Sequence, residues 1–147
     1  MGIAPPGARL HGYENLLRQL MMERLTHRAL PGQGMAAVPV VLRGEQAIAH
    51  VRWEPVPGLV DVALALPLAV PEAALVAVGA ELHRVNFGLS LLGFCLDATT
   101  GRVVFRTHAL LGPDGLAPGT IGALLAAATE TSARHLAGLR TLARGDA

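Results

Sequence analysis

The spacing of apolar residues changes several times along the chain, and each change predicts a new element of secondary structure. Between Gly12 and Leu30 apolar residues recur every three or four positions, which predicts a helix with one apolar side. The residues on that side are Tyr13, Leu16, Leu17, Leu20, Met21 and Leu25. Proline and glycines at positions 31–34 then predict the end of this helix.

Three segments of alternating pattern follow, and the turns between them predict how they pair as antiparallel strands. A two-residue turn at 44–45 would pair Leu42 with Ala47, and a second turn would pair Glu54 with Leu59. Both registers place the same apolar side chains on one face of a sheet, whereas a slip by one residue would reverse the faces. This predicted core face consists of Val40, Leu42, Ala49, Val51, Trp53, Val60, Val62 and Leu64.

A second helix is predicted from Pro71, because proline suits the first position of a helix. Apolar or small residues surround much of its circumference, and such a helix is usually covered on more than one side. We therefore expect it to contribute the interface of a homodimer. The residues expected in that interface are Leu75, Val76, Val78 and Leu82.

A third hairpin and a last helix complete the pattern. Pairing Asp97 with Arg102 across a short loop brings opposite charges together and sets Phe94 opposite Phe105 on the core face. The last helix is predicted over about 118–144. Its packing stripe consists of Ile121, Leu125, Ala128, Ser132, Leu136 and Leu139.

The resulting order is α-β-β-β-α-β-β-α, which predicts an α+β fold with helices packed on a five-stranded antiparallel sheet.

The length of 147 residues predicts a single domain over residues 1–147, with a flexible start at residues 1–11. The N-terminus lacks the apolar segment of a signal peptide, and no apolar run reaches the length of a membrane span, about 20 residues. We therefore expect a soluble, cytoplasmic protein.

Composition limits the classes of function. Apolar residues make up 52% of the chain and charged residues 16%, which excludes a disordered chain. The formal net charge of +1 provides no general attraction for nucleic acid or for an anionic membrane. The chain contains arginine but no lysine, so lysine chemistry is excluded.

Three segments of the second half resemble a known protein family. They read RVNF at 84–87, LGFCLD at 92–97 and GRVVFR at 101–106. They are similar to the YbjN pattern of an asparagine ending the middle helix, then Gly-aromatic-x-Leu-Asp, a short turn and an arginine-bearing strand. The first helix, with LLRQL at 16–20, resembles the opening helix of type III secretion chaperones.

This resemblance implies the fold of type III secretion chaperones and a non-enzymatic, often dimeric protein-binding module. Secretion chaperones hold partly unfolded client proteins, whereas YbjN-like proteins of bacteria are described as sensory or stress regulators. The resemblance therefore implies a chaperone-like or regulatory role, and the client protein stays open.

The candidate groups for catalysis and metal binding are isolated in the sequence. The single cysteine, Cys95, has no local histidine motif to activate it, and the six histidines lack the paired spacing of metal ligands. His50, Cys95 and His108 could share one face of the sheet, but their separation depends on the strand order. We therefore expect no catalytic residue, no metal site and no cofactor.

The sheet face opposite the core combines arginine and histidine with apolar side chains, which is unusual for a solvated surface. We predict that a partner protein binds this face through Ile48, His50, Arg52, Val104, Arg106 and His108. One alternative is a solvated face with the ion pairs Arg52–Asp61 and Arg102–Asp97. Another is the binding of a small ligand or a nucleic acid, although no aromatic side chain is predicted on this face for base stacking.

Overall fold

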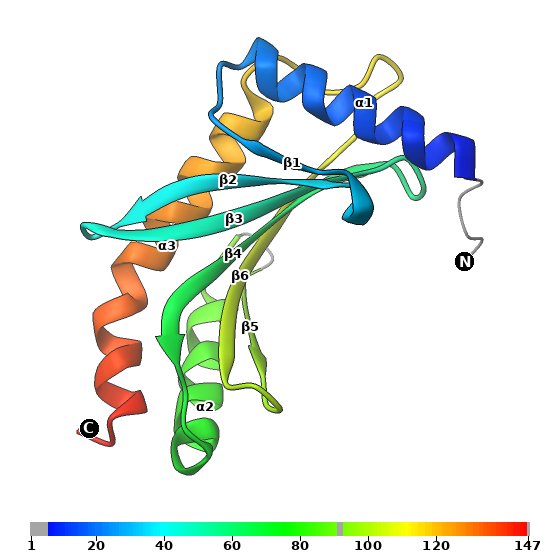
Figure 1. The fold of residues 1–147 in the computed structure, drawn as a ribbon. Coiled ribbons are helices and arrows are strands. Elements are labelled where there is room, and N and C mark those ends of the chain that lie inside the picture. The colour runs from blue at the N-terminus through cyan, green and yellow to red at the C-terminus, as the bar shows by residue number, and fades with distance from the viewer. Residues whose placement is uncertain (1–5, 91–92, 147) are drawn as a thin grey trace.

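The computed structural model describes residues 6–90 and 93–146. In this part of the chain six antiparallel strands form one sheet in the order β1-β2-β3-β4-β6-β5, and three α-helices pack against it (Figure 1). The α+β class is confirmed, but the predicted number of five strands is wrong, because β1 has no counterpart in the predicted pattern. The strands are β1 Arg28–Leu30, β2 Met35–Leu42, β3 Glu45–Glu54, β4 Leu59–Ala69, β5 Gly93–Asp97 and β6 Arg102–Leu110. The α-helices are α1 Pro6–Met22, α2 Leu75–Phe87 and α3 Thr120–Ala143.

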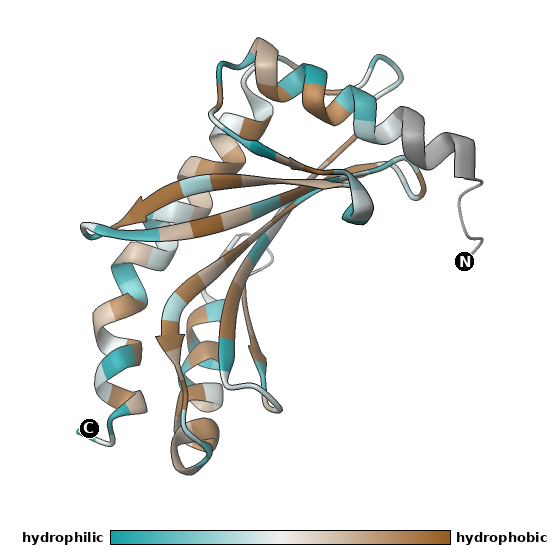
Figure 2. Ribbon diagram, in the orientation of Figure 1, coloured by the Kyte–Doolittle hydropathy of each residue, from teal (hydrophilic) through white to brown (hydrophobic). Residues whose placement is uncertain are grey.

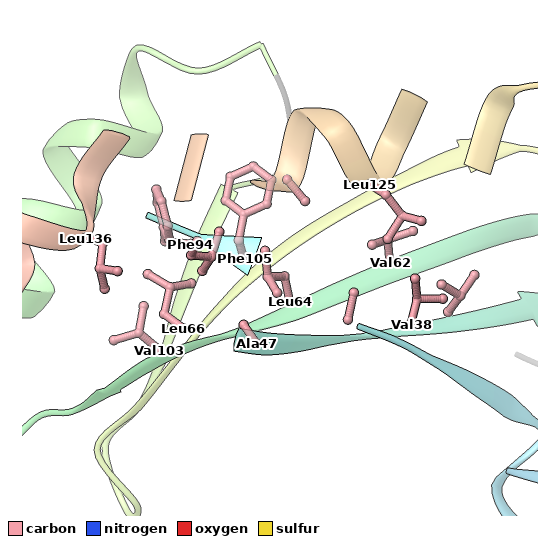
Figure 3. Packing of buried hydrophobic residues seen from close by; sticks show 14 of the residues in the cluster. Val38, Ala47, Val62, Leu64, Leu66, Phe94, Val103, Phe105, Leu125 and Leu136 are labelled. Atoms are coloured by element: carbon pink, nitrogen blue, oxygen red, sulfur yellow. The ribbon is translucent and has the colours of Figure 1, made fainter. Parts of the chain in front are cut away.

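The three helices share one hydrophobic core with one face of the sheet. Leu16 of α1 and Val78 of α2 belong to the same buried cluster as Val62 of β4. Figure 3 shows part of this cluster, with Leu125 of α3 lying next to Val62. The predicted packing stripe of α3 is buried along its whole length, and the predicted core face of the strands is buried except at Val40 and Trp53, which are half-buried.

The first helix ends well before Leu30, where the sequence pattern places its end. Arg24 adopts a left-handed conformation with a φ of 56°. The backbone N–H groups of Arg24 and Leu25 donate to the carbonyl groups of Met21 (3.1 Å) and Leu20 (3.0 Å). This pair of hydrogen bonds is the Schellman motif, which ends a helix. The chain beyond it is free to form β1, which pairs with the start of β2.

The other helix boundaries lie closer to the predicted ones. α1 begins at Pro6, within the segment predicted to be flexible, whose residues 1–5 lie outside the described residues. A 3-10 turn at Glu72–Ala74 precedes α2, and α3 lies inside the predicted range. Among the described helices, none is long and apolar enough to cross a membrane.

The β2–β3 hairpin differs from the predicted register. Leu42 pairs with Glu45 rather than with Ala47, because the turn consists of Arg43 and Gly44. Their φ values of 49° and 83° are both positive, which is typical of the type I′ turn that suits the twist of a hairpin. The partner of Leu42 changes by two residues, and an even shift leaves the same side chains on the core face.

The two other predicted hairpins are confirmed. Glu54 pairs with Leu59 at the start of β4, and Phe94 pairs with Phe105 between β5 and β6. The two phenylalanine rings meet edge to face, with their centroids 4.9 Å apart. Both aromatic rings therefore belong to the core, as the predicted register requires.

The sheet forks where β3 and β4 separate (Figure 1). Their pairing ends at Ala49 and Leu64; the start of β3 then continues with β2, and the end of β4 continues with β6. Arg140 of α3 bridges the two arms, because its guanidinium binds the Glu45 carboxylate and donates to the carbonyl oxygen of Pro67 at 2.7 Å.

Candidate functional site

The strongest candidate site is the sheet face that faces away from the core. The described helices all pack on the core face, and none of them covers the opposite one. We call this surface the open face. The side chains that the strand register places on it include Arg28, Met35, Ala37, Pro39, Val41, Gln46, Ile48, His50, Arg52, Glu54, Leu59, Asp61, Ala63, Ala65, Cys95, Asp97, Arg102, Val104, Arg106, His108 and Leu110.

The strand order brings the predicted partner-binding residues to this one face. Arg52 lies opposite Asp61, which lies opposite His108 on β6. In the next row His50 lies opposite Ala63, which lies opposite Arg106. Ile48 and Val104 lie on different arms of the fork, so the predicted site is continuous at its charged centre and divided at its apolar end.

Ion pairs occupy the charged centre, but not in the predicted combination. Arg106 donates to the Asp61 carboxylate at 3.0 Å, and this hydrogen bond raises the pKa of the Arg106 guanidinium. Arg52 instead lies 3.5 Å from the Glu54 carboxylate. The predicted Arg52–Asp61 pair is therefore wrong, because β6 delivers a second arginine to Asp61 from its other side.

The carboxylate of Asp97 is also bound differently from the prediction. Arg102 lies opposite Asp97 in the register, but the carboxylate accepts hydrogen bonds from the Thr100 hydroxyl and the Thr99 backbone N–H, both at 2.9 Å. These bonds within the turn are the main cause of the lowered pKa of Asp97, and the charge of Arg102 adds to it. Asp97 therefore stabilises the β5–β6 turn rather than a surface ion pair.

A shallow hollow lies on the open face between β3, β4, β6 and β5. Its volume is about 420 Å³, and its lining consists of Arg52, Glu54, Leu59, Asp61, Gly93, Cys95, Arg106 and His108. Cys95, which is exposed, and His108, which is half-buried, both line the hollow, whereas His50 does not. Across residues 6–90 and 93–146 no group of three or more histidine, cysteine or acidic side chains is placed to hold a metal ion.

Apolar side chains lie exposed beside the charged centre. Val41 is 60% exposed and Ile48 is 46% exposed on the β2–β3 arm, next to the exposed Pro39. Figure 2 shows hydrophobic positions interspersed with hydrophilic ones along the strands. Leu91 would join this face if the alternation of β5 extended back to it, but it lies outside the described residues.

The predicted homodimer residues on α2 do not share one surface. Val78 and Leu82 are buried in the core, because they form the side of α2 that packs on β5 and α3. Leu75 is half-buried, and Val76 is 87% exposed. Val78 and Leu82 are therefore unavailable to a second chain, which corrects the predicted set.

Sequence reasoning missed two exposed residues that lie on the two surfaces predicted to bind partners. Phe87, at the end of α2, is 92% exposed and lies three turns from Val76 on the same side of the helix. Arg28 belongs to the open face only because β1 pairs with β2, and a three-residue strand has too short a pattern to be recognised.

Comparisons with known proteins agree with this fold. The family model of YbjN, described as "Putative bacterial sensory transduction regulator", matches residues 17–140. The crystal structure of YbjN from E. coli, described as "a putative transcription regulator", is similar with a TM-score of 0.66 and 12% sequence identity. The similarity covers 91% of this chain and 93% of that one. A comparison with curated proteins finds no match.

Proposed function

The chain belongs to the YbjN family, and from this premise we propose that it is a non-enzymatic regulatory module that binds another protein through its open face. The family's description as a sensory transduction regulator supports the regulatory role. The descriptions in these comparisons concern regulators, and neither concerns a type III secretion chaperone. The proposal includes a chaperone-like use of the same face, in which it holds a client protein.

The observation that carries the proposal is the uncovered, partly apolar face of the sheet. In an antiparallel sheet with helices on one side, the other face is normally polar. Here Val41 and Ile48 are strongly exposed, and Val104 is half-buried on the other arm. Exposed apolar side chains that gather on one surface are typical of a site for a protein partner.

Small-ligand binding in the hollow is a less favoured alternative. Two guanidinium groups and His108 would attract an anion, but Asp61 and Glu54 already neutralise Arg106 and Arg52. A small anion would therefore have to replace existing ion pairs. A protein partner gains contact with the apolar flank as well, which requires no such replacement.

We also propose that the protein forms a homodimer through the outer side of α2. The exposed Val76 and Phe87 replace the buried Val78 and Leu82 as the expected contacts. Ala80 and His83, both exposed, lie between them at helical spacing. This side of α2 is separate from the open face, so one chain could use both surfaces at once.

Photo-crosslinking tests the partner-binding proposal. A photoreactive amino acid is placed at Ile48 on the open face or at the exposed Ala126 on α3, and each variant is irradiated in its native host. We expect a reproducible crosslinked partner from position 48 but not from position 126. Crosslinks of equal yield from both positions would show that the open face has no special role.

A further inference from the structure

We propose that the partner segment which docks on the open face is an amphipathic helix with acidic side chains along one edge. This inference rests on the proposed function and specifies the chemistry of its partner. The pairing of β1 with β2 places Arg28 in the row of side chains across the strands that also contains His50 and Arg106. We call this the positive row. β1 therefore extends the positive part of the open face to the edge of the sheet.

The charges of the open face favour a negatively charged partner. The face and its rim hold four arginines and three carboxylates. Asp61 pairs with Arg106 and Glu54 with Arg52, whereas Asp97 is bound by the Thr99 N–H and the Thr100 hydroxyl within the β5–β6 turn. Arg28 is exposed and has no carboxylate partner in the described part of the chain. An incoming carboxylate therefore finds an available guanidinium and meets no unpaired acid. A basic segment would find carboxylates that are already bound by arginines or, at Asp97, by hydrogen bonds of the turn.

The spacing of the positive row suits a helix that crosses the strands. Arg28, His50 and Arg106 lie on β1, β3 and β6, so each is two strands from the next. Two strand spacings amount to about 9.6 Å. Seven residues of an α-helix advance about 10.5 Å, so a helix that crosses the strands places side chains seven positions apart over successive members of this row. An acidic side chain is expected over Arg28, because Arg106 is already paired with Asp61.

The apolar flank explains why the helix should be amphipathic. Ile48 lies two residues from His50 along β3, so its side chain is about 6.7 Å along the strand from the positive row. The exposed Pro39 lies opposite Ile48, and Val41 follows on β2. Apolar side chains on the helix surface next to its acidic edge would cover these three residues.

Nucleic acid is the less suitable occupant. Trp53, Phe94 and Phe105 lie on the core side of the sheet, so the described open face offers no aromatic ring for base stacking. An apolar flank contributes nothing to contacts with a phosphate backbone.

The test uses designed peptides and the full chain. One fluorescent helical peptide of about 18 residues carries glutamate along one edge and leucine beside it, and a matched peptide carries lysine in place of glutamate. A labelled DNA duplex serves as the third probe. Anisotropy titrations compare the wild-type protein with Arg28→Ala, Ile48→Ser and Arg18→Ala, the last being an exposed arginine on α1.

We expect only the glutamate peptide to bind, with a Kd that rises roughly two- to fivefold for Arg28→Ala, as for the loss of an exposed ion pair. Ile48→Ser should weaken binding as well, and Arg18→Ala should leave the Kd unchanged. Binding of the lysine peptide with equal or higher affinity, binding of the DNA alone, or binding of none of the probes would overturn the inference. If none of the probes binds while position 48 still crosslinks a host protein, the proposed function stands and only the acidic helix is rejected.

Discussion

The side chain of Asn86 pairs with the backbone of Phe94 as a neighbouring β-strand would. The amide Oδ1 accepts a hydrogen bond from the Phe94 N–H, and Nδ2 donates to the Phe94 carbonyl oxygen, both at 2.8 Å. Phe94 lies on β5, at the edge of the sheet, so its outward backbone groups have no partner strand. The asparagine at the end of α2 therefore connects this helix to the sheet edge and closes part of the edge.

Gly93 is a necessary part of this arrangement. Its φ of 108° lies in the region that favours glycine, and a Cβ atom there would overlap the Asn86 amide. The same contact therefore explains both the asparagine and the glycine of the YbjN-like sequence pattern. They allow α2 and β5 to approach closely enough to exchange hydrogen bonds.

Removing the Asn86 amide should destabilise the protein without abolishing folding. Asn86→Ala leaves the N–H and carbonyl of Phe94 without partners, which we expect to lower the free energy of unfolding by about 1–3 kcal/mol. Urea denaturation measures the change. The control is Asn15→Ala on α1, whose side chain makes no hydrogen bond among the described residues and which should cost less. Equal losses for the two variants would contradict the importance of the Asn86–Phe94 bonds.

Phe105 and its two neighbours should respond very differently to substitution. Phe105 is fully buried, so Phe105→Ala should cost about 3–5 kcal/mol of stability. Arg106→Ala loses the partly exposed pair with Asp61, which is worth about 0–1 kcal/mol. Val104→Ala removes a half-buried side chain from the open face and should cost less than Phe105→Ala.

Melting curves of these three variants test the register, and binding measurements test the site. If Val104→Ala and Arg106→Ala retain their folds but crosslink less partner through position 48, the open face binds that partner. Unfolding of both variants as readily as Phe105→Ala would mean that the faces of β6 are assigned incorrectly. Normal crosslinking by stable variants would place the contacts elsewhere.

Two substitutions on α2 should separate dimerisation from folding. Val76→Glu places a charge on the exposed side of α2 and should shift a homodimer toward monomer in sedimentation experiments. Val78→Glu places an unpaired charge in the core and should unfold the protein. Ala137→Glu, at an exposed position of α3, is the control that should change neither property. A wild-type protein that stays monomeric at high micromolar concentration would rule out the proposed dimer.

His135 should make the protein less stable in mild acid. Its half-buried ring meets Phe94 edge to face at 5.8 Å, and burial is the main cause of its lowered pKa. Arg134 and Arg84 lower this pKa further, whereas Glu81 acts in the opposite direction. Because the unfolded chain takes up the proton more readily, stability falls as the pH drops below the ordinary histidine pKa of about 6.5.

Urea unfolding at pH 7.5 and pH 5.5 measures this effect. His135→Gln cannot titrate, so it should lose less stability than the wild type between the two pH values. Loss of the ring contact with Phe94 affects the variant at both pH values and cancels in this comparison. An unchanged pH dependence in His135→Gln would reject the role of His135.

The sequence by itself determined those features that depend on near neighbours. The hairpins at Glu54–Leu59 and Asp97–Arg102 follow from short turns and from alternation, so their registers could be predicted. The buried stripe of α3 follows in the same way from helical periodicity. The first turn is predicted at 44–45 and lies at Arg43 and Gly44, yet the predicted core face is correct, because a shift of two residues keeps each side chain on its side of the sheet.

Only the tertiary structure decided which distant residues meet. The pairing of β4 with β6 brings Arg106 to Asp61, and β1 adds Arg28 to the same face. Packing on β5 and α3 decides which side of α2 is buried, since its apolar residues alone allow several orientations. These contacts join residues far apart in the chain, and local periodicity carries no information about strand order. The folded chain settles them by burying the largest apolar surface while keeping its polar groups paired.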